Sequence, residues 1–198
     1  MGNVLVAIDF DRVIASWARH AQVPFEVLKP LFIHGRAYES HERGEIDVAR
    51  YFASLRDELG IDIPDAAFAE GWNAVFLDPI APTIELVHRL APLVPQYVFS
   101  NTNAAHHAHW RGRYRDAFGP IRRHFLSHEM GLRKPEPAAF ERLARDLGLP
   151  PERILFFDDL PVNVAAAREV GMEGVLVRST EDVARAVRPW LGERAGQP

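Results

Sequence analysis

The stretch Ile154-Leu155-Phe156-Phe157-Asp158-Asp159-Leu160-Pro161-Val162-Asn163 places two adjacent carboxylates directly after a strongly apolar run. Residues 153–157 have the length and the aromatic content of a buried β-strand. Residues 162–170 have the periodicity of a helix, and Gly171 follows as a typical stop signal. In open parallel sheets the ligand lies beyond the carboxyl ends of the strands, so the acidic pair is the first candidate for function.

Strand-like runs alternate with helix-like segments on both sides of this stretch. The predicted strands are residues 4–8, 96–100, 125–127, 153–157 and 174–177, and the predicted helices are residues 82–90, 137–147 and 162–170. Alternation of this kind implies parallel strands with helices on both faces of the sheet. We therefore expect an α/β fold, a Rossmann-like three-layer sandwich with a mostly parallel central sheet.

The chain between Trp17 and Phe76 interrupts the alternation. It contains helical patterns at residues 24–32, 46–59 and 64–76 and no convincing strand. We expect residues 17–79 to form a helical cap, and residues 1–16 and 80–198 to form the core. Within the cap, His34, His41, Glu42 and Arg43 are candidates to face a substrate. The small, polar tail 192–198 is expected to fray.

Composition excludes several functional classes. The 198 residues include no cysteine, so disulfides, thiolate metal sites and cysteine nucleophiles are absent. A net charge of -4 with interspersed signs gives no general attraction for nucleic acid or anionic membrane. The apolar runs are too short to span a bilayer. We expect a cytoplasmic protein, a monomer or a homodimer, that binds a small molecule.

Two more polar clusters follow predicted strands. Ser100-Asn101-Thr102-Asn103 comes directly after residues 96–99, where hydroxyl, amide and backbone N–H groups can converge on a phosphoryl oxygen. Lys134 precedes a predicted helix and is one of only two lysines among 23 basic residues. Each cluster also has a structural interpretation, as turn formers or as a surface lysine.

The acidic pair itself has two interpretations. Adjacent carboxylates at a strand end repel each other unless a cation or hydrogen-bond donors compensate. Magnesium, which proteins bind through one or two carboxylates plus substrate phosphate, is one such cation. Alternatively, Asp158 or Asp159 caps the helix that follows.

In chain order, Ser100-Asn101, Lys134-Pro135 and Asp158-Asp159 with Asn163 resemble the second, third and fourth motifs of the haloacid dehalogenase superfamily. The resemblance is closest to the glucose-1-phosphate phosphatase-like branch, which includes the phosphatase domain of some epoxide hydrolases. It covers nearly the whole chain, including His41-Glu42-Arg43-Gly44-Glu45-Ile46 and Gly71-Trp72-Asn73-Ala74-Val75-Phe76.

The resemblance implies a magnesium-dependent phosphatase that acts on a small phosphorylated metabolite, for which a sugar phosphate is one candidate, through an aspartyl-phosphate. By motif, Ser100 and Asn101 hold phosphoryl oxygens, Lys134 neutralises their charge and Asp159 binds Mg²⁺. Asp158 and Asn163 support that geometry.

The nucleophilic aspartate of the first motif has two candidate positions. Asp9 follows the predicted strand 4–8, with Asp11 as general acid, but Arg12 stands where the superfamily normally has glycine. Alternatively, Met1-Gly2-Asn3-Val4 aligns with the x-Gly-Asn-Val part of Phe-Asp-x-Gly-Asn-Val, which puts the nucleophile one position before Met1. The motif register favours the second alignment. That alignment removes a central strand, so stability requires residues 4–8 to occupy its place.

Three other hypotheses stay open. A chain without a placed nucleophile is a catalytically impaired module that binds phosphate. A haloacid dehalogenase, which needs no metal, is disfavoured by the acidic pair. His106, His107 and His109 suggest a zinc site, but no acid lies nearby at ligand spacing. We therefore expect these histidines to be solvated or close to the substrate.

Overall fold

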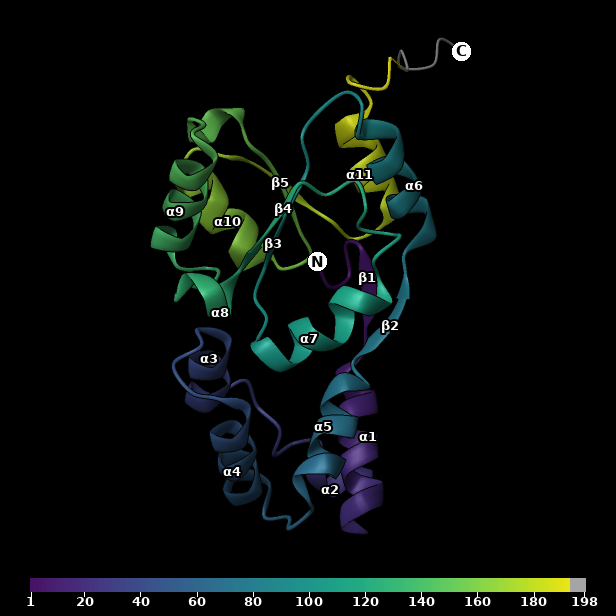
Figure 1. Cartoon of the computed structure of the whole chain (residues 1–198), viewed down its shortest axis with the longest axis vertical. Helices are drawn as coiled ribbons and strands as arrows, with labels where there is room; N and C mark the ends of the chain where they lie inside the picture. The colour runs from purple at the N-terminus through teal and green to yellow at the C-terminus, as the bar shows by residue number, and fades with distance from the viewer. Residues whose placement is uncertain (193–198) are drawn as a thin grey trace.

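The computed structural model describes residues 1–192, so most of the tail that is expected to fray lies outside the described residues. Figure 1 shows an elongated molecule with an α/β lobe at the top and a helical lobe at the bottom. The strands are β1 (Val6–Ile8), β2 (Phe76–Pro79), β3 (Tyr97–Ser100), β4 (Arg123–Leu126), β5 (Leu155–Asp158) and β6 (Glu173–Leu176). The helices of the lower lobe are α1 (Phe10–Ala21), α2 (Phe25–Leu28), α3 (Arg36–Glu42), α4 (Val48–Leu59) and α5 (Asp65–Asn73).

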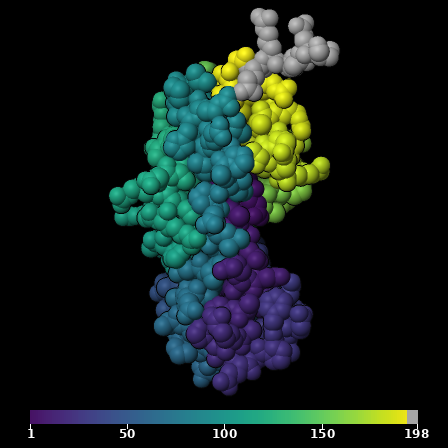
Figure 2. Space-filling view, turned by 90° about the vertical axis from the view of Figure 1, so that its right-hand side faces the viewer, coloured from purple at the N-terminus to yellow at the C-terminus, as the bar shows by residue number. Residues whose placement is uncertain are grey.

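The upper lobe contains the remaining helices. They are α6 (Ala81–Leu90), α7 (Ala104–Arg113), α8 (Ser127–Met130), α9 (Pro137–Leu147), α10 (Pro161–Glu169) and α11 (Thr180–Val187), with a 3-10 turn at Pro151–Arg153. In Figure 1, α9 and α10 lie to one side of the strands and α6 and α11 to the other, with α7 facing the lower lobe. Figure 2 shows α6 and α11 side by side on one surface. The predicted α/β class with helices on both faces is confirmed.

The strands hydrogen-bond in three pairs within residues 1–192. Strands β3 and β4 pair in parallel, from Tyr97 opposite Arg123 to Ser100 opposite Leu126. Strands β5 and β6 also pair in parallel, whereas β1 and β2 are antiparallel. The sequence does not predict strand β2, because Asp78 and Pro79 are residue types that strands usually exclude.

The helices cover the strands through two hydrophobic clusters. One joins Phe99 and Phe156 of the strands to Phe140 of α9 and Ala167 of α10. The other joins residues of α6 and α11. A third and larger cluster fills the lower lobe and extends to α7, where Trp110 is fully buried. Proline in the first turn of α6, α9 and α10 suits helix starts that follow strand ends.

The first residues of the chain do not form the predicted strand in full. The Met1 carbonyl accepts a hydrogen bond from the Leu5 amide at 2.9 Å, and Asn3 has a left-handed φ of 52°, so residues 1–5 turn tightly. Only Val6–Ile8 is extended, and it pairs with β2. The strand predicted at residues 4–8 is therefore confirmed only for residues 6–8, and its partner there is the antiparallel β2.

The lower lobe contains the helices expected at residues 46–59 and 64–76, which are α4 and α5. The pattern at residues 24–32 yields only the four-residue α2. Helix α1 runs through residue 17 without a break, so a cap boundary at that residue falls inside a helix. Trp17 of α1 donates to the Phe68 carbonyl of α5 at 3.1 Å, and Gly71 lies so close that any Cβ would meet the indole at 2.4 Å. The division into a cap at 17–79 and a core stays a prediction.

Within residues 1–192, none of the helices has the length and apolar character that spanning a membrane requires.

The aromatic contacts of Phe140 give a test of the core. Phe140 is fully buried and meets Phe99 and Phe156 edge to face at 5.4 Å. Phe140→Ala should lower the free energy of unfolding by about 3–5 kcal/mol, because it removes apolar burial and leaves a cavity. Leu93→Ala, at a side chain that is 53% exposed, should change it by less than about 0.5 kcal/mol. Urea unfolding of both variants measures the difference, and equal losses would contradict the packing.

Candidate active site

The carboxyl ends of β3 and β5 are joined by the side chain of Lys134. Its Nζ atom donates to Asp158 Oδ2 at 2.6 Å and to the Phe99 carbonyl at 3.0 Å. The ammonium also lies over the Phe99 and Phe156 rings, 5.2 and 5.4 Å from their centroids. Only 5% of the Lys134 side chain and 4% of the Asp158 side chain are exposed. A buried cation thus stands at the sheet edge where a ligand is expected.

Both carboxylate oxygens of Asp158 accept hydrogen bonds. Its Oδ1 atom accepts from the Leu160 amide at 3.0 Å and from Asn163 Nδ2 at 2.8 Å, and Oδ2 accepts from Lys134. Burial by itself would raise the pKa of Asp158, but the charges of Lys134 and the Met1 amine, with the hydrogen bonds from Lys134 and Asn163, hold it below its usual value. Asp158 is therefore an ionised partner of Lys134 with both oxygens hydrogen-bonded.

Asn101 holds the Lys134 loop in place. Its Nδ2 atom donates to the Lys134 carbonyl and its Oδ1 atom accepts from the Lys134 amide, both at 2.8 Å. An amide side chain can serve both backbone groups at once because it carries a donor and an acceptor. Asn101 thus acts in this structure on the neighbouring loop rather than as a free phosphate-binding group.

Ser100 and the residues after it line the same edge. Ser100 is buried at the end of β3, and its hydroxyl donates to the Asn101 carbonyl at 3.1 Å. Ser127, at the end of β4, donates to the Thr102 carbonyl and accepts from the Thr102 amide, both at 2.8 Å. Asn103 caps α7 by accepting from the His106 amide. The whole turn after β3 is therefore fixed by side chains.

Asp159 points to a different neighbour from Asp158. Its Oδ2 atom accepts from Asn3 Nδ2 at 3.0 Å, and the side chain is only partly buried. The Met1 amine lies in the same region. Burial first, and the Lys134 charge second, lower its pKa to about 5, although Asp158 and Asp159 oppose the shift. The amine is thus mostly neutral at pH 7.

Asp9 lies apart from this cluster. It caps α1, and its Oδ1 atom accepts from the Asp11 amide at 2.9 Å. Asp11 in turn pairs with Lys29 at 2.7 Å. Among the contacts found within residues 1–192, none joins Asp9 to Lys134, Asp158 or Asp159. The contacts above join Ser100, Asn101, Lys134, Asp158 and Asn163 in one chain of hydrogen bonds. Asp159, the next residue after Asp158, contacts Asn3, and Asp9 stays at the start of α1.

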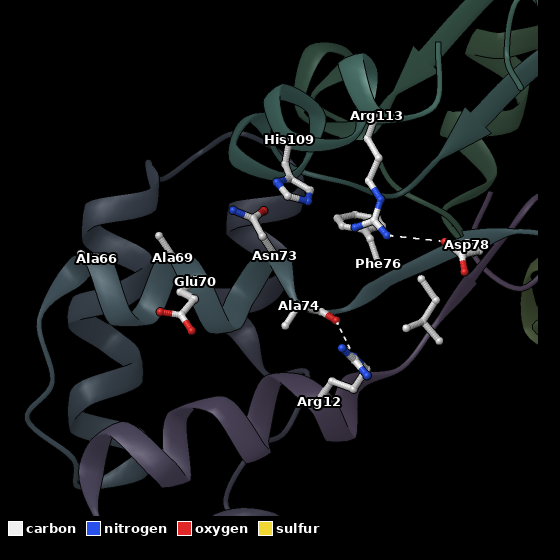
Figure 3. A pocket seen from close by; sticks show the side chains of 11 residues that line it. Arg12, Ala66, Ala69, Glu70, Asn73, Ala74, Phe76, Asp78, His109 and Arg113 are labelled. Carbon is white, nitrogen blue, oxygen red and sulfur yellow. Dashed lines mark hydrogen bonds and ion pairs between the residues drawn. The ribbon is translucent and has the colours of Figure 1, made fainter. Parts of the chain in front are cut away.

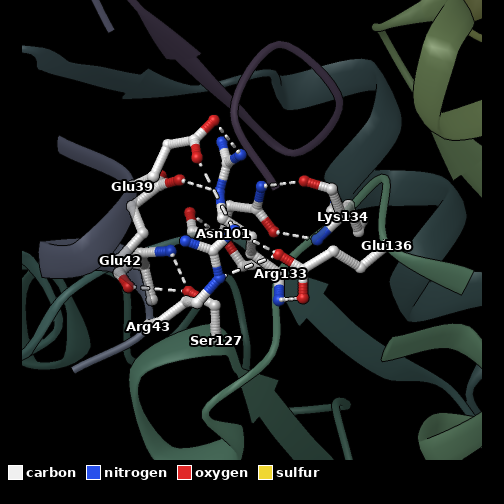
Figure 4. Close-up of polar contacts among 10 residues, drawn as sticks. Glu39, Glu42, Arg43, Asn101, Ser127, Arg133, Lys134 and Glu136 are labelled. Atoms are coloured by element: carbon white, nitrogen blue, oxygen red, sulfur yellow. Dashed lines mark hydrogen bonds and ion pairs between the residues drawn. The ribbon is translucent and has the colours of Figure 1, made fainter. Parts of the chain in front are cut away.

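The lower lobe binds the Lys134 loop through five charged residues, which Figure 4 shows between α3 and the loop. Arg133 donates to Glu42 at 2.9 Å and to Glu39 at 3.0 Å. Arg43 pairs with Glu136 at 2.5 Å and lies 3.6 Å from Glu39. Burial raises the pKa of Glu42, although Arg133 opposes the shift. We call Glu39, Glu42, Arg43, Arg133 and Glu136 the latch.

The histidines that the sequence singles out have separate surroundings. His106 Nε2 contacts the Trp72 carbonyl at 3.0 Å, and burial lowers its pKa to about 3, so it is a neutral packing residue. His41 stacks on Tyr51 and His34 on Tyr38. His109 lines a pocket of about 730 Å³ between α5 and α7, together with Arg12 and Arg113. Figure 3 shows His109 and Arg113 entering this pocket from α7.

The donor set at the sheet edge fits a hard cation such as magnesium. The charge of Asp158 is already balanced by Lys134. Asp159 offers a partly exposed carboxylate that is paired with the neutral Asn3 amide, so its negative charge is available to a cation. Magnesium keeps several waters and needs only one or two protein carboxylates when substrate phosphate is present. Asp159 is the residue that would hold it.

Sequence reasoning misses Asn3 and most of the latch. Asn3 meets Asp159 across 156 positions, and Arg133 meets Glu42 across 91, which no local pattern reveals. Glu42 and Arg43, which the sequence offers as candidates to face a substrate, bind Arg133 and Glu136 of the Lys134 loop. Their facing a substrate stays a prediction. The sequence offers one signal that could have pointed to the latch, which is that Arg133 stands directly before Lys134.

Asp158→Asn tests the buried pair. The change leaves the Lys134 ammonium without its partner, so the free energy of unfolding should fall by about 3–5 kcal/mol. Asp159→Asn, at a partly exposed neighbour, should cost much less. Since the pKa of Asp158 lies below its ordinary 3.8, the parent should lose this stabilisation as the pH falls below about 4, and Asp158→Asn should not. Unfolding curves across pH 2–7 measure both effects, and an equal loss in both variants contradicts the assignment.

A double-mutant cycle tests the latch. Arg133→Met and Glu42→Gln should show a coupling free energy of about 2 kcal/mol, because both groups are largely removed from water. The exposed pair Lys29 and Asp11 is the matched control and should couple more weakly. Chemical unfolding of both cycles provides the comparison. Additive effects of the Arg133 and Glu42 changes would contradict the latch.

Comparison with known proteins identifies the family of the chain. The haloacid dehalogenase-like hydrolase family matches residues 8–171. D-ribitol-5-phosphate phosphatase of Bacteroides thetaiotaomicron is 21% identical over 87% of this chain and 86% of that protein. Drimenol cyclase drtB of Aspergillus calidoustus is 26% identical over 95% of this chain, which spans 36% of that protein.

A solved structure has a similar fold. A haloacid dehalogenase family enzyme of Bacteroides thetaiotaomicron, in complex with magnesium and inorganic phosphate, superposes with a TM-score of 0.79 at 26% identity over 95% of this chain and 96% of that one. The resemblance seen in the sequence is thereby confirmed. The chain belongs to the haloacid dehalogenase-like hydrolase family.

Proposed function

We propose that the chain is a magnesium-dependent phosphatase that acts on a small phosphorylated metabolite, for which a sugar phosphate is one candidate. The observation that carries the proposal is the buried Lys134 ammonium, which bonds to the ends of β3 and β5 at the sheet edge where Asp159 follows Asp158 in the chain. Family membership makes the chain a hydrolase. Relatives and a structural neighbour whose names mention a phosphorylated polyol, magnesium and phosphate support the choice of substrate class.

The residues have distinct roles in this proposal. Lys134 neutralises charge on the phosphoryl oxygens, and the Ser100 hydroxyl turns from the Asn101 carbonyl to donate to one of them. Asn101 positions the Lys134 loop. Asp158 bonds to the lysine and Asn163 holds the Asp158 carboxylate, so together they orient the lysine. Asp159 holds the metal, which supplies charge neutralisation at the phosphate when bound.

The proposed nucleophile has the two positions that the sequence allows. In the first, Asp9 must leave the Asp11 amide and approach Lys134 and Asp159. In the second, an aspartate joined to the Met1 amine attacks, which is supported by the position of that amine near Lys134, Asp158 and Asp159. Attack by either carboxylate on phosphorus forms an aspartyl-phosphate and breaks the bond from phosphorus to the substrate oxygen, which leaves as the alcohol after taking up a proton. Water then hydrolyses the aspartyl-phosphate, which releases inorganic phosphate and restores the carboxylate.

The position of Asp9 favours a second candidate function. With the Asp9 carboxylate engaged at the start of α1, the described residues place the buried Lys134 ammonium at the sheet edge without an attacking group in contact with it. Such a chain binds phosphate or a phosphorylated ligand and does not turn it over. Binding and turnover are therefore measured separately.

Turnover of p-nitrophenyl phosphate tests the phosphatase proposal. Activity should require Mg²⁺, disappear on chelation, and fall about 100-fold or more in Lys134→Met, because the phosphoryl charge loses its main counter-charge. Lys29→Met, at the chain's other lysine, is the matched control and should keep full activity. Halide release from a haloacid that survives chelation would instead support a dehalogenase.

The nucleophile is tested by two changes in parallel. Asp9→Asn should abolish turnover if Asp9 attacks, whereas turnover that appears only after a Phe-Asp extension before Met1 supports the second position. Phosphate binding by calorimetry without turnover in either form supports the binding module. Absence of both binding and turnover contradicts all three forms of the proposal.

A cytoplasmic location and a monomeric or homodimeric state are part of the same proposal. They rest on the sequence composition alone.

A further inference from the structure

Three side chains from two helices come together beside the turn that follows β3. His107 belongs to α7, and His128 and Glu129 belong to α8, which follows β4 directly. One potential ligand atom from each lies within 4.8 Å of the other two. None of the three belongs to the set formed by Ser100, Lys134, Asp158 and Asp159.

The contacts between these side chains are too long for hydrogen bonds. His107 Nδ1 lies 3.8 Å from Glu129 Oε1, and His128 Nε2 lies 4.0 Å from the same oxygen. Hydrogen bonds of this kind need about 2.7–3.2 Å. Two metal bonds of about 2.1 Å span at most about 4.2 Å between ligands, so both separations suit two ligands of one ion.

The surroundings also suit a metal ion. The side chains of His107 and His128 are 21% and 11% exposed, whereas the side chain of Glu129 is 56% exposed. The two imidazoles are therefore largely enclosed by protein, and the carboxylate is open to solvent.

We propose that His107, His128 and Glu129 form a binding site for a divalent transition metal ion of the zinc class. Two imidazole nitrogens and one carboxylate oxygen are the ligand set of open zinc sites, whereas magnesium prefers oxygen ligands alone. The chain has no cysteine, so nitrogen and oxygen ligands are the ones available to such an ion. Water completes the coordination at the exposed side.

Occupancy of this site would link α7 to α8. Ser127, which precedes His128, holds both backbone groups of Thr102, and α7 begins directly after that turn. The backbone at His128 also meets the lower lobe, because a Cβ placed on Gly44 would lie 2.5 Å from the His128 carbonyl oxygen. A bound ion would therefore stabilise the turn between β3 and α7 as well as the seam between the lobes.

Zinc calorimetry tests the site in an Asp159→Asn background, which removes the proposed magnesium ligand. The Asp159→Asn parent should bind one zinc ion. His107→Ala and His128→Ala should each weaken binding by at least about tenfold, since the loss of outer-sphere partners alone costs 10–100-fold in other sites. His109→Ala, on the same helix but outside the group, should bind like the parent.

A third variant, Glu129→Gln, tests the site even if a histidine variant fails to fold. The Glu129 side chain is largely exposed, so its replacement should leave the fold intact. Zinc should raise the melting temperature of the parent and raise that of Glu129→Gln less. Cobalt in place of zinc should give the visible absorption of a tetrahedral site in the parent alone. The proposal is overturned if the parent binds no zinc, or if His107→Ala and His128→Ala bind it as the parent does.

Discussion

The buried ion pair between Lys134 and Asp158 is the constraint on which the upper lobe depends. Strands β3 and β5 belong to different hydrogen-bonded pairs, and the Lys134 ammonium bonds to the end of each. Two ions removed from water are tolerated only when their remaining groups are satisfied. Leu160, Asn163 and Asn101 meet that requirement around the pair and its loop, so the polar residues at the sheet edge form one interdependent set.

The sequence predicts this set well because its signals are local. Ser100-Asn101 and Asp158-Asp159 directly follow apolar runs, and Lys134 precedes a helix that begins with Pro137 as expected. Parallel strands bring their carboxyl ends to one edge, so residues far apart in the chain can be grouped from the order of the strands alone. Both ends of the helix at residues 137–147 are also predicted correctly from local signals, because Pro137 marks its start and Gly148 its end.

What the sequence could not predict depends on pairing across the chain. Strand β2 forms despite Asp78 and Pro79, because β1 offers it a partner. The two hydrogen bonds between the Asn101 amide and the Lys134 backbone could not be predicted, since only the folded loop brings these groups together. The phosphate contact of Asn101 stays a prediction. The acid beside His107 is Glu129, which lies too far along the chain for a spacing argument to find it.

The latch has a mechanical consequence. Arg133 is held by two glutamates of α3, and the next residue in the chain is the lysine that faces the sheet edge. Any separation of the lobes that displaces Arg133 must pull on the peptide unit it shares with Lys134. The contacts of α3 with Arg133 and the contacts of Lys134 with the sheet edge are therefore mechanically coupled through one peptide bond.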